Sequence, residues 1–286
     1  MERRRIAGFE VAVLGLGTSR LASMGSGRSK SDARTLFDVA RDCGIDFIDT
    51  ADTYGSKAAE RWIRELTVED RDRWVVATKI GLPTVDLPGP FRIVNQPAKK
   101  IKQALGAGFA LDHATLARDV ERSLRRLQRD RIEILLLHLP PAGIVNDVET
   151  HEILRDLQRR GLIAQFGVSS DEIATIRGVR DAWRCTCAAT VVNPWSDAGL
   201  RGGVLEGFDV IANHVMGSAQ ERTALAAAGA PSGRDRASDW VPRRLLRHAA
   251  AVAGVQVVLT GTSSPEHLRA NAKAFDTRVS HLDLLA

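Results

Sequence analysis

The chain has 286 residues, 44% of them hydrophobic, which is enough for one large core or two small domains. Its net charge of +5 arises from 40 Lys and Arg against 35 Asp and Glu, so the surface is mixed in sign. Aromatic residues make up only 5% and none interleaves with the basic runs. We therefore interpret those runs as solvated helix faces and expect no nucleic-acid partner.

Three cysteines, Cys43, Cys185 and Cys187, give an odd number and no repeated metal-ligand spacing. We expect reduced, mostly buried thiols, no metal site and a cytoplasmic protein. The first residues lack the apolar run of a signal peptide. No segment approaches the roughly 18 unbroken apolar residues of a membrane span, so no membrane partner is expected.

Short apolar runs alternate with segments of helical spacing along the chain. Strands are predicted at 11–16, 45–48, 74–78, 134–137, 164–168, 188–192, 209–212 and 255–259. Helices are predicted at 32–42, 58–66, 115–127, 149–160, 172–182, 200–206, 242–253 and 265–275. This alternation predicts βαβ units with a parallel sheet, and eight units fit a single closed (β/α)8 TIM barrel, which has about 250 residues. We expect one domain over residues 1–286.

Two long segments interrupt the alternation, Gly81–His113 after the third strand and Asn213–Asp239 after the seventh. Both are predicted to be binding loops at the carboxyl-terminal mouth of the barrel. An open dinucleotide-binding sheet is the competing fold. Its Gly-x-Gly-x-x-Gly motif begins at Gly15 and Gly17, but Arg20 stands where the third glycine belongs, which favours the barrel.

Four polar residues, Asp49, Tyr54, Lys79 and His138, end or closely follow three apolar strands. Alone, each has an ordinary explanation as a helix cap, a packing residue or a core histidine. In a barrel of parallel strands, however, all four would face one mouth. We therefore interpret them together as a catalytic site.

The chemistry of this set suits proton transfer to oxygen. A lysine ammonium favours the phenolate and is expected to lower the pKa of Tyr54, while Asp49 keeps Lys79 charged. His138 can hydrogen-bond an oxygen beside the phenol, so Tyr54 could protonate a developing alkoxide. No side chain supplies a hydride, which implies a nicotinamide cofactor and a small carbonyl or alcohol substrate.

The chain resembles the aldo-keto reductase family in an ordered series of motifs over most of its length. The motifs are Gly15-Leu-Gly17-Thr18, Phe47-Ile-Asp49-Thr-Ala-Asp-Thr-Tyr54-Gly55, Ala77-Thr-Lys79, Leu136-Leu-His138-Leu-Pro140, Gly161-Leu-Ile-Ala-Gln-Phe-Gly-Val-Ser169 and the stretch Val258–Asn271. The resemblance implies a (β/α)8 barrel, NADP(H) more often than NAD(H), and the catalytic roles described above.

By the same resemblance, Ser169 and Ser170 would meet the nicotinamide carboxamide and Trp195 would stack on its ring. The remaining cofactor-binding residues would be Gly17, Thr18, Asp49, Gly261, Thr262, Ser263, His267 and Asn271. The last four of these would hold the adenosine and its 2′-phosphate at the start of the final helix.

Two other functions stay open at this point. The family usually has Asn and Gln where this chain has Ser170 and Val192, which motivates a non-catalytic or regulatory NADP(H)-binding protein on the same fold. Lys79 at a strand end also fits a Schiff-base aldolase or lyase, although Asp49 disfavours it. The sequence is compatible with a monomer or a small homo-oligomer.

Overall fold

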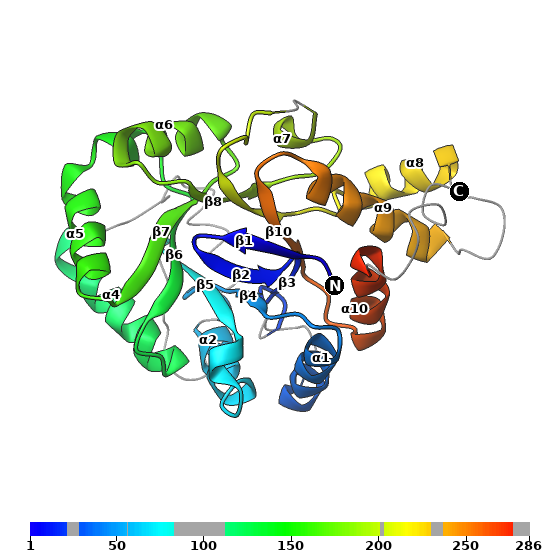
Figure 1. Ribbon diagram of the computed structural model, residues 1–286, viewed down its shortest axis with the longest axis horizontal. Helices are drawn as coiled ribbons and strands as arrows, with labels where there is room; N and C mark the ends of the chain where they lie inside the picture. Colours follow the sequence, from blue (N-terminus) through cyan, green and yellow to red (C-terminus); the bar gives the residue numbers. More distant parts are fainter. Residues whose placement is uncertain (22–28, 56, 83–111, 201–202, 230–236, 277–286) are drawn as a thin grey trace, which may run out of the picture.

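Eight parallel strands close into a barrel with helices around it in the computed structural model, which describes residues 1–21, 29–55, 57–82, 112–200, 203–229 and 237–276 (Figure 1). The neighbouring strands follow one another in chain order, and β10 pairs with β3 to close the barrel. The predicted (β/α)8 fold is therefore confirmed. The barrel strands are β3 (Leu14–Gly17), β4 (Phe47–Asp49), β5 (Val75–Ile80), β6 (Ile132–His138), β7 (Ile163–Ser169), β8 (Cys187–Val191), β9 (Asp209–Asn213) and β10 (Val255–Thr260).

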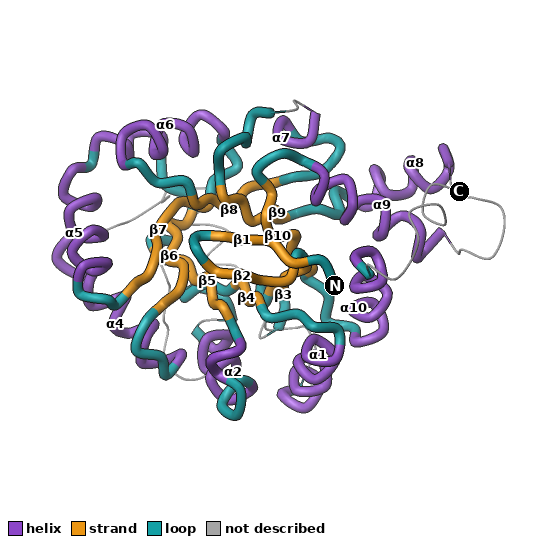
Figure 2. The backbone as a smooth tube through the Cα atoms, in the orientation of Figure 1, coloured by secondary structure: helices purple, strands orange, loops and turns teal. Residues whose placement is uncertain are grey.

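Helices pack outside these strands (Figure 2), so both faces of the sheet are largely buried and the strands are mostly apolar. The helices are α1 (Lys30–Asp42), α2 (Ala58–Leu66), α4 (His113–Leu127), α5 (Val148–Arg159), α6 (Ile173–Trp183), α7 (Asp197–Leu200), α8 (Ala219–Gly229), α9 (Ala237–Ala251) and α10 (Pro265–Ala272). Short 3-10 turns lie at Arg71–Arg73, Ala142–Asn146 and Lys273–Phe275.

The predicted first strand, residues 11–16, is wrong because the run is divided between two strands. A hairpin of β1 (Arg3–Ile6) and β2 (Phe9–Ala12) precedes the barrel, and β3 begins only at Leu14. Ala7 and Gly8 have φ of 51° and 89°, as the two-residue turn of a tight hairpin requires. The hairpin lies across the amino-terminal end of the barrel in Figure 1. The predicted run thus covers the end of β2 and the start of β3, which Val13 separates.

Two helix predictions are also wrong. The helix expected at 200–206 is instead α7 at Asp197–Leu200, because Gly203, with φ of 82°, opens a turn that the Glu206 N–H closes. The helix expected to start at Pro242 begins five residues earlier, with the proline inside α9. Proline is tolerated near a helix start, so it marked the beginning only approximately.

The long segment after the seventh barrel strand, β9, contains a helix that the sequence did not indicate. Helix α8 has no buried residue, so it lacks the apolar period on which the prediction relied. Alanine-rich composition and a reciprocal cap explain it: Ser218 N–H donates to Glu221, and Glu221 N–H donates to the Ser218 hydroxyl. Most of the loop after β5 lies outside the described residues, at 83–111.

Candidate active site

Asp49 and Lys79 meet inside the mouth of the barrel. They are the last residue of β4 and the second-last residue of β5, two paired parallel strands. The Lys79 Nζ donates to Asp49 Oδ1 at 2.5 Å and to the Thr50 carbonyl at 3.0 Å. The two side chains are 3% and 5% exposed. A buried charge pair of this kind is costly to keep in a core, so it points to a function.

Each partner of the pair offsets part of the effect of burial on the other. Burial alone would lower the pKa of Lys79, but the Asp49 carboxylate and the Tyr54 hydroxyl outweigh it and raise that pKa above its usual value. Burial likewise raises the pKa of Asp49, and the Lys79 ammonium opposes the rise. Lys79 is therefore an ammonium at neutral pH, as the sequence predicted.

Tyr54 is held over Lys79 by a short turn between β4 and α2. The Tyr54 N–H donates to the Ala51 carbonyl at 3.1 Å, and the Tyr54 carbonyl accepts from the Ala59 N–H at 3.4 Å. Its ring centroid lies 5.3 Å from Lys79 Nζ and 6.2 Å from the His138 ring, edge to face at 83°. The structure thus brings together all four predicted catalytic residues.

The direction of the pKa of Tyr54 differs from the expectation. Lys79 does favour the phenolate, but burial of the phenol is the larger effect, so the pKa lies above its ordinary value. The sequence revealed the charge near the phenol but not the depth of its burial. Tyr54 consequently holds its proton at neutral pH, and this is the state a proton donor needs.

His138 is the last residue of β6 and lies beside Ser169, one of the two residues predicted to contact the nicotinamide carboxamide. It is in register with Ser169, the last residue of β7, so the two side chains stand on adjacent strand ends. Ser169 and Ser170 are each 4% exposed. The Ser170 hydroxyl accepts from the Glu172 N–H at 3.1 Å, so it is partly engaged in starting α6.

Trp195 is the large apolar surface at this mouth, with 37% of it exposed. Its backbone N–H donates to the Asn193 side chain at 3.0 Å. Gly217 lies against the ring: a Cβ at that position would come within 2.7 Å of Trp195 Cζ3, and its φ is 56°. The sequence analysis missed Gly217, whose contact with the tryptophan only the fold reveals.

Two of the predicted cofactor-binding residues, Thr18 and Asn271, form hydrogen bonds that hold the barrel mouth together. Both the N–H and the hydroxyl of Thr18 donate to the Asp49 carbonyl at 3.0 Å, which fixes the end of β4. The Asn271 amide donates to the Thr260 hydroxyl at 2.9 Å and ties α10 to β10.

The ends of β3 and β10 form a cradle between Gly17 and Gly261. A Cβ at Gly17 would lie 3.8 Å from Gly261 Cα, and one at Gly261 would meet nothing within 4 Å. Thr262, Ser263 and His267 follow at the start of α10, where Ser264 caps the helix by accepting from the His267 N–H. Open space beside a helix N-terminus suits a phosphate-bearing group.

Other polar groups at the mouth carried no sequence signal. The Thr190 hydroxyl and Asn213 Oδ1, near the ends of β8 and β9, are buried without a hydrogen-bond partner among the residues the structure describes. Buried polar atoms are usually satisfied, so such atoms indicate capacity for a polar ligand. Together with the Gly17–Gly261 cradle and the exposed face of Trp195, they fit a dinucleotide with a nicotinamide ring.

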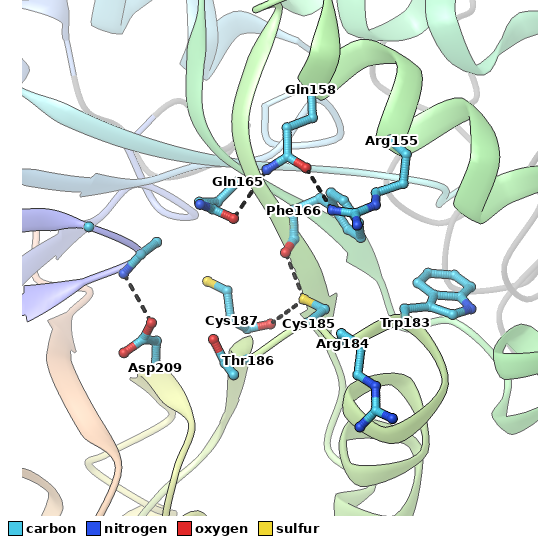
Figure 3. Close-up of a pocket in the computed structure, with 12 residues that line it drawn as sticks. Arg155, Gln158, Gln165, Phe166, Trp183, Arg184, Cys185, Thr186, Cys187 and Asp209 are labelled. Atoms are coloured by element: carbon cyan, nitrogen blue, oxygen red, sulfur yellow. Dashed lines mark hydrogen bonds between the residues drawn. The ribbon is translucent and has the colours of Figure 1, made fainter.

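A cavity of about 260 Å³ (Figure 3) lies at the amino-terminal strand ends, at the opposite end of the barrel from Asp49 and Lys79. Its lining comes from β7, the amino ends of β8 and β9, the hairpin turn and the helices α5 and α6. Its polar groups satisfy one another: Gln158 donates to Gln165, Cys185 to the Phe166 carbonyl, and the Ala7 N–H to Asp209. Burial raises the pKa of Cys185 to about 11, so this thiol is inert.

Comparison with known proteins agrees with this geometry. The model of the aldo/keto reductase family matches residues 13–198, which include all four catalytic candidates. This chain belongs to the aldo/keto reductase family. Among the residues that the structure describes, no helix is long and apolar enough to cross a membrane. The same residues contain no group of three or more side chains that could bind a metal ion.

Individual relatives are distant. Aldo-keto reductase YhdN of Bacillus subtilis is 31% identical over 187 residues, 63% of this chain and 51% of that protein. The chain spans about half the length of the curated relatives it matches. A putative aldo-keto reductase structure from Pseudomonas aeruginosa has 26% identity and a TM-score of 0.69, over 96% of both chains. A Klebsiella pneumoniae reductase solved with NADP and acetate has 21% identity and a TM-score of 0.67, over 99% and 93% of the chains.

Proposed function

We propose that this member of the family is an oxidoreductase that reduces an aldehyde or ketone to an alcohol, or catalyses the reverse, with NADP(H). The observation that carries the proposal is the buried Asp49–Lys79 pair beneath the Tyr54 ring. Such a pair gives a phenol a charged neighbour, which would stabilise negative charge on oxygen during a carbonyl reduction.

Each of the four residues has one role in this reaction. Tyr54 gives its proton to the substrate oxygen, and His138 hydrogen-bonds that oxygen and orients it. The Lys79 ammonium stabilises the phenolate that remains, and Asp49 keeps Lys79 charged in a site with little water. The raised pKa of Tyr54 keeps the acid form available at neutral pH.

The hydride would come from a bound nicotinamide cofactor, which supplies the reducing electrons. We assign its ring to Trp195, Ser169 and Ser170, and its adenosine end to Gly261, Thr262, Ser263, His267 and Asn271. The Klebsiella pneumoniae relative of the same fold, solved with NADP and acetate, supports NADP(H) as the cofactor, with NAD(H) as the second choice.

A Schiff-base aldolase is disfavoured by the same geometry. Attack on a carbonyl needs a neutral amine, whereas the salt bridge with Asp49 raises the pKa of Lys79 and keeps it protonated. The amine would also have to leave its bonds to Asp49 and the Thr50 carbonyl.

The test is Tyr54→Phe, which removes only the phenol oxygen. We expect NADPH oxidation with reactive aldehydes to fall by about 100-fold or more, because the general acid is lost. NADPH binding, measured by quenching of tryptophan emission, should stay nearly unchanged. Unchanged turnover would remove Tyr54 from the mechanism. A wild-type protein that binds NADPH but reduces no carbonyl would instead support a regulatory role, and binding of neither dinucleotide would refute both functions.

A further inference from the structure

Asp52, two residues before Tyr54, carries a partly buried carboxyl that the proposed reaction does not use. Its Oδ1 atom is buried and has no hydrogen-bond partner among the residues the structure describes. Its backbone N–H donates to the Lys79 carbonyl at 3.1 Å, which docks the turn against β5. Asp52 thus belongs to the same turn as the catalytic phenol, but its side chain faces a different set of groups.

The charged side chains around the Asp52 carboxyl are two acidic and two basic residues, so their charges balance. Glu60 on α2 is fully buried, and its two carboxylate oxygens accept from the Thr78 hydroxyl at 2.9 Å and from Arg126 Nε at 2.5 Å. Asp119 on α4 and Lys57, just before α2, also act on the Asp52 carboxyl. The Arg126 side chain, 16% exposed, therefore bonds directly to Glu60 and acts on the Asp52 carboxyl only through its charge.

A neutral Asp52 fits this environment better than an ionised one. Burial and the Glu60 charge raise the pKa of Asp52 to about 7, against the opposing pull of Arg126 and Lys57. Ionisation would place a second carboxylate beside Glu60 without a further hydrogen-bond donor at the Asp52 Oδ1 atom. The buried Oδ1 atom gains water only if the carboxyl turns outward.

We propose that Asp52 is a positioning residue for Tyr54, whose turn stays packed while the Asp52 carboxyl is protonated and loosens when it ionises. The turn is short and internally bonded, from the Ala51 carbonyl to the Tyr54 N–H and from the Tyr54 carbonyl to the Ala59 N–H. Movement at Asp52 therefore carries the phenol with it, away from Lys79 and His138. The proton exchanges with solvent, and no covalent bond changes.

Tyr54 is the only tyrosine in the chain, so it can be observed directly. Protein labelled with 13C at the tyrosine Cζ gives one NMR resonance, followed against pH on both sides of neutrality. We expect a step centred at about pH 7 in the wild type, where the phenol itself is still protonated. Asp52→Asn, which imitates the neutral carboxyl, should lose the step, while the control Asp119→Asn should keep it.

The effect on catalysis rests on the proposed function and is measured separately. In the wild type, kcat for aldehyde reduction should fall as pH rises through about 7, before the phenol ionises, and Asp52→Asn should lose this earlier fall. A wild-type resonance without a step near neutrality, or a step that persists in Asp52→Asn, would overturn the proposal. Absence of any turnover would refute the proposed reaction while the NMR titration still decides the role of Asp52.

Discussion

The two ends of the barrel compensate their polar groups in different ways. At the mouth, Lys79 and Asp49 bury opposite charges beneath a phenol, and the Asn213 Oδ1 atom is buried with no partner in the described part of the chain. At the amino-terminal end, the polar side chains around the cavity bond to one another, as Gln158 does to Gln165. The cavity is at one end, and the buried Lys79–Asp49 pair lies beneath the phenol at the other.

This difference shows which property marks the site. The cavity of about 260 Å³ lies where the hairpin and the strand ends leave space unfilled. It needs no ligand, because its polar groups are satisfied. A buried ion pair carries the desolvation cost of both charges, and apolar residues could replace it if stability alone mattered. The buried Lys79–Asp49 pair beneath Tyr54 is therefore a better guide to function here than the cavity.

The largest effect is expected from Lys79→Met, which breaks the ion pair at the mouth. Turnover should fall to background because Tyr54 loses the charge that stabilises its phenolate. The folded state should lose about 3–5 kcal/mol, measured by urea unfolding, because the Asp49 carboxylate is left buried and unpaired.

The double variant Lys79→Met with Asp49→Asn separates these two consequences. Removing both charges should restore most of the stability but none of the turnover. If Lys79→Met keeps its activity, the mouth is not a proton-transfer site. The buried ion pair then does not mark the functional end of the barrel.

A smaller effect is expected from Gly217→Ala, which acts on the cofactor surface of the mouth. The added Cβ would approach Trp195 Cζ3 to 2.7 Å, so the ring must move. We expect NADPH affinity to weaken by up to about tenfold, since aromatic stacking contributes about 0.5–1.5 kcal/mol. Fluorescence titration with NADPH measures this.

Gly207→Ala is the matched control for that variant. Gly207 also has a positive φ, 78°, but a Cβ there meets nothing within 4 Å. Both variants carry backbone strain, and only one disturbs the tryptophan. Equal NADPH affinities in the two variants would mean that the position of Trp195 does not matter for the cofactor.

Sequence reasoning identified the barrel, and it selected the four candidate catalytic residues that the fold brings together, because both depend on local patterns. Apolar runs alternate with helical spacing, and Asp49, Lys79 and His138 each end a run. The hydrophobic periodicity predicts neither the hairpin of β1 and β2 nor helix α8. The hairpin divides an apolar run, and α8 buries no side chain.

What depends on three-dimensional burial could not be predicted. The sequence places a lysine near Tyr54 but does not show that the phenol is buried deeply enough to raise its pKa. It likewise gives no sign that Asp52 faces Glu60 and Arg126 from two other elements. The contact of Gly217 with Trp195 joins residues 22 positions apart, and only the folded chain brings them together.

The smallest effect is expected from Arg155→Ala at the amino-terminal cavity. Arg155 is exposed, and its guanidinium donates to the Gln158 side chain at 3.3 Å on the same helix, α5. Its loss should change the free energy of unfolding by no more than about 0.5 kcal/mol, as for most surface substitutions. NADPH affinity and kcat should equal those of the wild type, because the cavity lies at the opposite strand ends from Lys79 and Tyr54. A clear change in either would mean that the cavity is coupled to the mouth, and the two ends could no longer be treated as one packing end and one functional end.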